Sequence, residues 1–124
     1  MNSVQGDRLE NANAYLSDSF LAMTEWYRKT LYYETGIYGS QGTSPLPDID
    51  EIRYKFDAWV DKNIILLQQY VCHTYIHNKE KYSDMASLAI IIANSIDDKI
   101  AAPLEVACLL LKNGLDDLCL GDHF

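Results

Sequence analysis

The chain has 124 residues, of which 48% are hydrophobic and 23% charged, a composition typical of one globular domain rather than of a disordered chain or a membrane span. Its 10 Lys and Arg residues and 18 Asp and Glu residues give a net charge of −8 at pH 7 and a pI near 4.6. This charge repels phosphate backbones and anionic lipids, so nucleic acids and membranes are excluded as expected partners, whereas a basic protein is attracted.

The first expected helix covers residues 7–34. Apolar residues recur there every three or four positions, which is the period of one helical face. Asp7 is the expected N-cap, with Glu10 three residues later as in a capping box, and Gly36 is a natural stop. Residues 35–47 hold three of the six glycines and two of the three prolines, so we expect a long loop of the kind that often carries function.

A second long helix is expected to begin at Asp48 and to reach about Asn78. Asp48 and Glu51 repeat the capping pattern, and a long apolar stripe follows them. A third helix is expected from about Ser83. It is apolar on nearly all sides, which predicts that it is the central and most buried helix.

The last part of the chain is expected to form a fourth helix and one further turn. Pro103 disfavours the helical conformation at the residue before it, so the chain should break or kink near residues 98–102. Gly114 is well placed as a left-handed cap of the fourth helix, and residues 115–120 then add a turn. The expected fold is all-α, an antiparallel bundle of four to five helices in a single domain over residues 1–124, with a long loop between the first and second helices.

The three cysteines, Cys72, Cys108 and Cys119, are an odd number without close spacing, and each has apolar neighbours. They are interpreted as buried, reduced thiols, with a disulfide between two of them as the less favoured alternative. The first residues lack the basic start and apolar stretch of a secretory signal, and no apolar run reaches the roughly 20 residues of a membrane span. We therefore expect a cytoplasmic protein.

Two histidines, His73 and His77, are four residues apart and share one helical face, which makes a zinc site one alternative. The segment lacks the glutamate that a metalloprotease helix uses as its general base, and no obvious third ligand accompanies the pair. The glycine-containing loop has neither a preceding strand nor a lysine for phosphate binding. We expect no catalytic residues, no metal and no cofactor, and thus not an enzyme. A metal-dependent helical enzyme using the histidine pair remains an alternative.

Carboxylates are the more informative feature of the C-terminal quarter. Residues 94–124 hold six acidic groups and two basic ones, a local net charge of −4. We expect one partner-binding acidic patch where the turn between the third and fourth helices meets the C-terminal end. Its residues are Asp97, Asp98, Glu105, Asp116, Asp117 and Asp122.

A second-choice binding surface combines aromatic residues with the acidic start of the second helix. Tyrosines supply large contact area at low entropic cost, and those at the end of the first helix and in the long loop cannot all face the core. The residues of this surface are Tyr32, Tyr33, Tyr38, Asp48, Asp50, Glu51, Asp57 and Asp61.

In size, charge and helical pattern the whole chain resembles bacterial immunity proteins that neutralise toxin domains, particularly those paired with contact-dependent growth inhibition toxins and colicin-like nucleases. The resemblance implies a basic nuclease domain as the partner and an inhibitor that occludes its active site with acidic side chains. It rests on overall character, so no residue role is transferred from the family. A phage-type inhibitor or a helical subunit of a larger assembly is the alternative among binding proteins.

Overall fold

The computed structural model describes residues 3–35 and 46–120, with side chains for residues 7–31 and 46–119. All regular secondary structure in these ranges is helical, which confirms the all-α prediction. None of the described helices is long and apolar enough to span a membrane. The long expected loop falls mostly on residues outside the described ranges.

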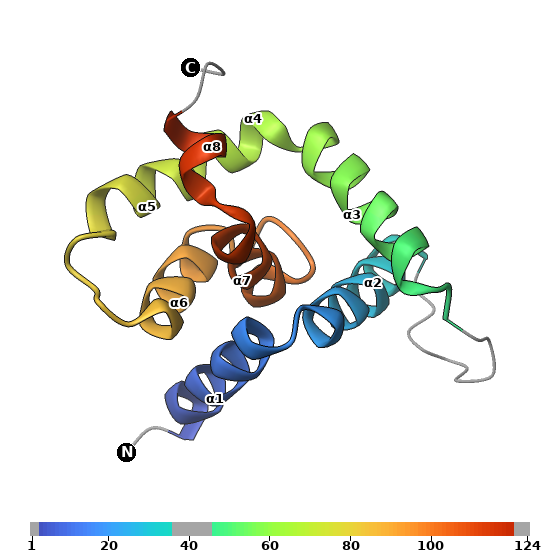
Figure 1. Ribbon diagram of the computed structural model, residues 1–124, viewed down its shortest axis with the longest axis horizontal. Coiled ribbons are helices and arrows are strands. Elements are labelled where there is room, and N and C mark those ends of the chain that lie inside the picture. Colours follow the sequence, from blue (N-terminus) through green and yellow to red (C-terminus); the bar gives the residue numbers. More distant parts are fainter. Residues whose placement is uncertain (1–2, 36–45, 121–124) are drawn as a thin grey trace.

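The first expected helix is divided into α1 (Ser3–Ser17) and α2 (Ser19–Thr35), which follow one another across a break at Asp18 (Figure 1). The Asp18 carboxylate accepts a hydrogen bond from the backbone N–H of Leu21 at 3.1 Å, a local bond that favours a helix start. The apolar periodicity continues across the break, so it predicted a single helix. The predicted N-cap at Asp7 is wrong, because α1 already begins at Ser3.

The second expected helix is an arch of four consecutive segments that curves around the other helices (Figure 1). The predicted N-cap is confirmed, since Asp48 accepts a hydrogen bond from the backbone N–H of Glu51 at 2.9 Å. The end predicted near Asn78 is confirmed as well. The segments are α3 (Ile49–Lys62), α4 (Ile64–Leu66), the π-helical η1 (Leu67–Cys72) and α5 (His73–Asn78).

The bend in this arch lies at Asn63, where the backbone leaves the helical region with φ −108° and ψ 21°. The Asn63 side chain donates a hydrogen bond to the carbonyl oxygen of Trp59 at 2.9 Å, so an amide competes locally with the helical ladder. The bend separates α3 from η1 and lets α3 pack against α2, while η1 and α5 pack against α6.

Three further helices complete the fold, α6 (Met85–Ser95), α7 (Pro103–Asn113) and α8 (Leu115–Leu120). The N-cap of α6 is Asp84, one residue after the predicted start. The chain breaks before Pro103 as predicted, and Gly114 adopts the predicted left-handed conformation with φ 96°. Only glycine takes this φ readily, so the sharp turn from α7 into α8 depends on Gly114.

The most buried helix is α7 rather than α6. Eight of the eleven residues of α7 are buried, against six of eleven in α6, which corrects the prediction that the third helix is the central one. The full apolar circumference of α6 suggested that it was central, but α7 packs against α1, α2, α6 and α8. The same core extends between α2 and α3, where the Trp26 and Phe56 rings meet edge to face with centroids 5.1 Å apart.

Candidate functional site

The residues of the expected acidic patch do not lie together. Asp97 and Asp98 are exposed in the turn that precedes α7, whereas Asp116 and Asp117 are exposed at the start of α8, which follows it. The eleven residues of α7 separate these positions by about 16 Å along the helix axis. Asp122 lies outside the described residues. The turn and the C-terminal end therefore do not form the single patch that the sequence predicted.

Glu105, the remaining member of the expected patch, is buried and does not belong to the surface. Its side chain is 1% exposed, and Oε2 accepts hydrogen bonds from the Tyr15 hydroxyl at 2.9 Å and from the Lys29 ammonium group. The prediction that Glu105 belongs to an exposed acidic patch is wrong. Its role is to connect α7 to both α1 and α2 through one charged cluster.

Burial and the Glu105 carboxylate also raise the pKa values of two neighbouring groups, the Tyr15 hydroxyl and the Cys108 thiol. The pKa of Tyr15 is raised by its burial and by the nearby Glu105 carboxylate, and the same two causes raise the pKa of the buried Cys108 thiol to about 12. In the unfolded chain these groups ionise near their ordinary values of 10.0 and 9.0. The folded state thus keeps protons that the unfolded chain releases in alkali.

We expect the free energy of unfolding to fall as the pH rises above 9. A group whose pKa is raised by folding contributes fully to the free energy of unfolding at pH values below its pKa in the unfolded chain. This contribution is lost as the pH rises from the unfolded-state pKa to the folded-state pKa. The loss is about 1.4 kcal/mol per pH unit for each group that is ionised only in the unfolded chain. Urea unfolding between neutral and alkaline pH measures this slope. The Cys108→Ala variant should show a shallower slope from pH 9 upward, and an unchanged slope would contradict the assignment to Cys108.

Two of the exposed carboxylates already have cationic or hydroxyl partners in the chain. Asp98 accepts a hydrogen bond from Lys99 at 3.1 Å, which lowers the pKa of Asp98, and Asp116 accepts one from the Tyr75 hydroxyl at 2.9 Å. Lys79 lies 3.6 Å from the same Asp116 oxygen. These contacts fix the turn and α8 locally and partly neutralise both carboxylates.

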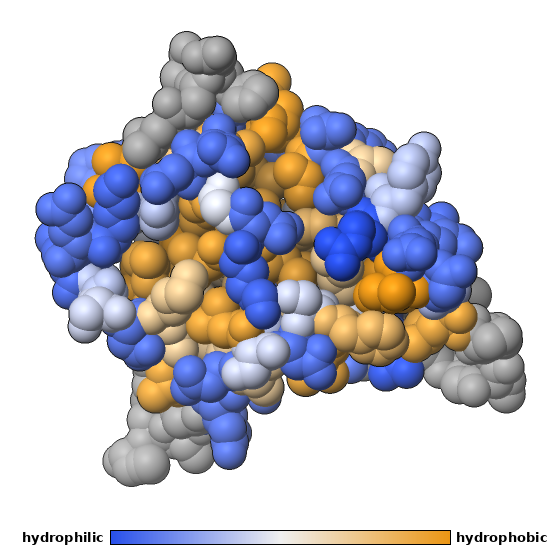
Figure 2. All heavy atoms as spheres, in the orientation of Figure 1, coloured by the Kyte–Doolittle hydropathy of each residue, from blue (hydrophilic) through white to orange (hydrophobic). Residues whose placement is uncertain are grey.

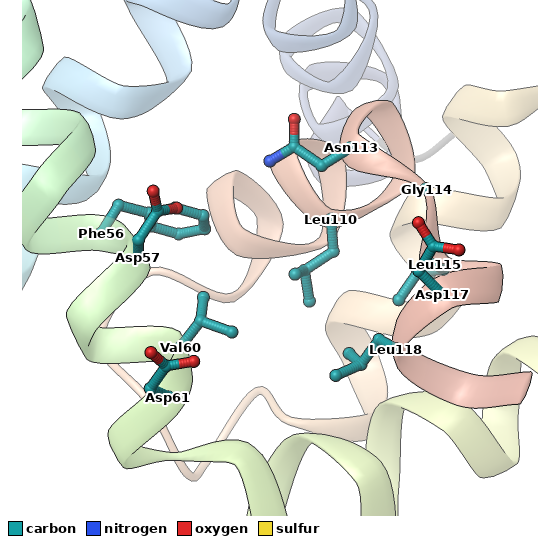
Figure 3. A pocket seen from close by; sticks show the side chains of 10 residues that line it. All are labelled: Phe56, Asp57, Val60, Asp61, Leu110, Asn113, Gly114, Leu115, Asp117 and Leu118. Atoms are coloured by element: carbon teal, nitrogen blue, oxygen red, sulfur yellow. The ribbon is translucent and has the colours of Figure 1, made fainter. Parts of the chain in front are cut away.

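Three other carboxylates surround a groove between α3 and the α7–α8 corner, here called the acidic groove (Figure 3). Its volume is about 260 Å³. Asp57 and Asp61 stand one helical turn apart on α3, and Asp117 lines the groove from α8, with its carboxylate beside Gly114. The groove is lined by Phe56, Asp57, Val60, Asp61, Leu110, Asn113, Gly114, Leu115, Asp117 and Leu118.

The floor of the acidic groove is apolar and its rim is negative. In Figure 3 the side chains of Val60, Leu110 and Leu118 point toward one another across the gap. The lining contains three carboxylates and neither lysine nor arginine. Within the described part of the chain, none of these carboxylates has an ion-pair partner. Figure 2 shows apolar surface in the region that α3, α7 and α8 enclose.

The sequence placed the three rim residues on different predicted surfaces. Asp117 was assigned to the C-terminal patch, and Asp57 and Asp61 to the second-choice surface. The spacing of four residues between Asp57 and Asp61 is a local signal of a shared helical face. The approach of α8 to α3 has no local signal, so the sequence could not join Asp117 to the other two.

The other residues of the second-choice surface lie elsewhere. Asp48, Asp50 and Glu51 are exposed at the start of α3, where Asp48 caps the helix and Glu51 lies 3.9 Å from Lys55. The side chains of Tyr32 and Tyr33 and all of Tyr38 are outside the described residues.

The histidine pair lies on α5, away from the groove-lining residues. Both rings are exposed, with centroids 4.3 Å apart, and Nδ1 of His77 is 2.8 Å from the carbonyl oxygen of His73. Among the residues that the structure describes, no three His, Cys, Asp or Glu side chains form a group that could hold a metal ion.

Cys72 and Cys119 form a disulfide, with Cα atoms 5.2 Å apart, whereas Cys108 is a buried free thiol. The prediction of three reduced thiols is wrong for the bonded pair and confirmed for Cys108. The partners are 47 residues apart in sequence and meet because the turn at Gly114 folds α8 onto η1. This bond fixes the helix that supplies Leu115, Asp117 and Leu118 to the acidic groove.

The chain matches no model of a known protein family, no curated protein and no solved structure. Its function is therefore inferred from the geometry and charge of its own residues.

Proposed function

We propose that this protein is an inhibitor of the immunity-protein type, which binds a basic nuclease toxin domain and blocks its active site. The observation that carries the proposal is the acidic groove, in which three carboxylates without ion-pair partners among the described residues surround an apolar floor. Nuclease active sites bind a polyanion with cationic side chains, and an acidic surface is complementary to them.

The groove suits a lysine or arginine side chain of the partner. The aliphatic stem of such a residue can lie on Val60, Leu110 and Leu118, while its charged end pairs with the rim carboxylates. An arginine that makes two parallel hydrogen bonds to one carboxylate gains the strongest pairing. Inhibition then requires no chemistry from this chain, because the bound cation no longer contacts the nucleic acid.

The net charge of −8 supports the same proposal at longer range. Opposite net charges on two proteins accelerate their encounter, and salt screens this attraction beyond about 8 Å at physiological ionic strength. The Cys72–Cys119 disulfide, which holds α8 at the acidic groove, persists in an oxidising compartment and would be reduced in the cytoplasm. We therefore propose action in an oxidising compartment rather than in the cytoplasm that the sequence predicted.

The combined variant Asp57→Asn, Asp61→Asn and Asp117→Asn is expected to weaken binding to a cognate basic nuclease domain by about 100-fold, or roughly 1 kcal/mol for each lost pairing. Calorimetry or biolayer interferometry with a catalytically inactive toxin domain measures this change. The association rate of the wild type should also fall as salt is raised.

The matched control is Asp7→Asn, Glu10→Gln and Glu80→Gln, which removes the same charge from exposed positions outside the groove. It should change the association rate slightly and leave the dissociation rate unchanged. Equal affinity losses in both variants would assign the effect to net charge and contradict a groove-specific interaction. A tight complex that is insensitive to salt would instead favour the alternative of a helical subunit with a neutral partner.

A further inference from the structure

A second groove lies between α2 and α3, on the other side of α3 from the acidic groove, and its volume is about 430 Å³. We propose that it binds a small planar aromatic carboxylate. Two features support this ligand class, namely a rigid aromatic wall and a pair of lysines. The volume lies within the roughly 300–1,000 Å³ typical of small-molecule sites.

The aromatic wall is held in place by ring contacts beneath it. Trp26 is 3% exposed. Its ring meets the rings of Phe56 and Trp59 edge to face, with centroid distances of 5.1 Å and 6.0 Å. The ring centroid of Tyr27 lies 6.5 Å from that of Trp26, and the Tyr54 residue is 75% exposed. Fixed rings lose little entropy on binding and offer faces and edges to a planar ligand, so they favour an aromatic group over an aliphatic one.

The charge of this groove is opposite to that of the protein as a whole. Lys55 and Lys62 line it, and its described lining residues include no Asp or Glu, although the chain has a net charge of −8. Among the described residues, the one ion pair of Lys55 is a long, exposed contact with Glu51 at 3.9 Å, which contributes little. Lys62 has no ion-pair partner within the described residues. Both ammonium groups are therefore available to an anion.

The spacing of the two lysines indicates a small ligand. They are seven residues apart on α3, which separates their Cα atoms by about 10 Å along the axis. A bicyclic aromatic carboxylate of similar length can place its rings against Trp59 and Tyr27 and its carboxylate at either lysine. Charge complementarity thus selects an anion, and the aromatic lining selects a flat one.

The experiment is a titration of the ¹⁵N-labelled full-length protein with 2-naphthoate, followed by NMR. The chain has two tryptophans, so its two indole N–H signals report directly on this groove. We expect saturable shifts of these signals at millimolar ligand or below. The neutral analogue 2-naphthalenemethanol should bind about fivefold more weakly because it lacks the charge that the lysines recognise.

Variants assign the effect to the lysines. Lys55→Gln with Lys62→Gln should weaken 2-naphthoate binding by about fivefold and leave the neutral analogue unaffected. The control pair Arg53→Gln with Lys81→Gln removes the same charge from exposed residues outside the groove and should leave binding unchanged. The proposal would be overturned by any of three results. These are equal binding of the charged and neutral probes to the wild type, equal losses of 2-naphthoate binding in the two double variants, and the absence of a saturable shift. The probe comparison uses only wild-type protein, so the test survives a variant that does not fold.

Discussion

The Glu105→Ala variant is expected to lose about 3 kcal/mol of unfolding free energy, equivalent to a fall in melting temperature of roughly 10 °C for a domain of this size. The substitution leaves the Tyr15 hydroxyl without its acceptor in a buried position. It also removes the carboxylate that pairs with Lys29. Because Lys29 is 39% exposed and can be rehydrated, the loss should lie at the lower end of the range for broken buried ion pairs. Urea denaturation at neutral pH measures it.

A double-mutant cycle with Tyr15→Phe separates the hydrogen bond from the cavity that alanine leaves. The Tyr15→Phe substitution should cost about 1 kcal/mol in the wild type and much less in the Glu105→Ala background, where the hydroxyl has already lost its acceptor. Strictly additive losses would show that the two side chains are not coupled and would contradict the buried cluster.

Local sequence patterns predicted the helix ends that are set by contacts within one helical turn. Asp48 caps α3 and Gly114 ends α7 because each acts on backbone groups within a few residues. The breaks at Asp18 and Asn63 were missed although they are also local. Aspartate and asparagine can bond to nearby backbone groups anywhere on a helix, and the apolar stripe gave no sign that they did so here.

The candidate site was only partly predictable, because its decisive contacts are distant in sequence. The partners of Glu105, Tyr15 and Lys29, are 90 and 76 residues away, so a carboxylate counted as surface charge is in fact internal. Glu105 lies between Leu104 and Val106 in an apolar segment, and this position indicates burial. The count of acidic residues did not take that position into account. The pairing of Cys72 with Cys119 had no such signal, because spacing alone does not show which helices meet.

Reduction of the Cys72–Cys119 disulfide is expected to lower the unfolding free energy by about 4 kcal/mol, the chain-entropy value for a loop closed by residues 47 apart. The effect should be largest at α8, a helix of six residues that is also attached by packing of Leu115 and Leu118, by the Asp116 contacts and by a weak bond from Gln68 to the Leu118 carbonyl oxygen. Denaturation with and without a phosphine reductant measures the global loss, and hydrogen exchange measures the opening of α8.

The Cys72→Ala, Cys119→Ala variant should match the reduced wild type in stability and should be insensitive to the reductant. In both proteins the amides of α8 should exchange faster than those of α7, which keeps its buried contacts. Since α8 carries Asp117, Leu115 and Leu118, its release removes one wall of the acidic groove, and binding to the toxin domain should weaken together with the loss of protection. Unchanged exchange in α8 after reduction would show that packing of this helix, rather than the disulfide, maintains the groove.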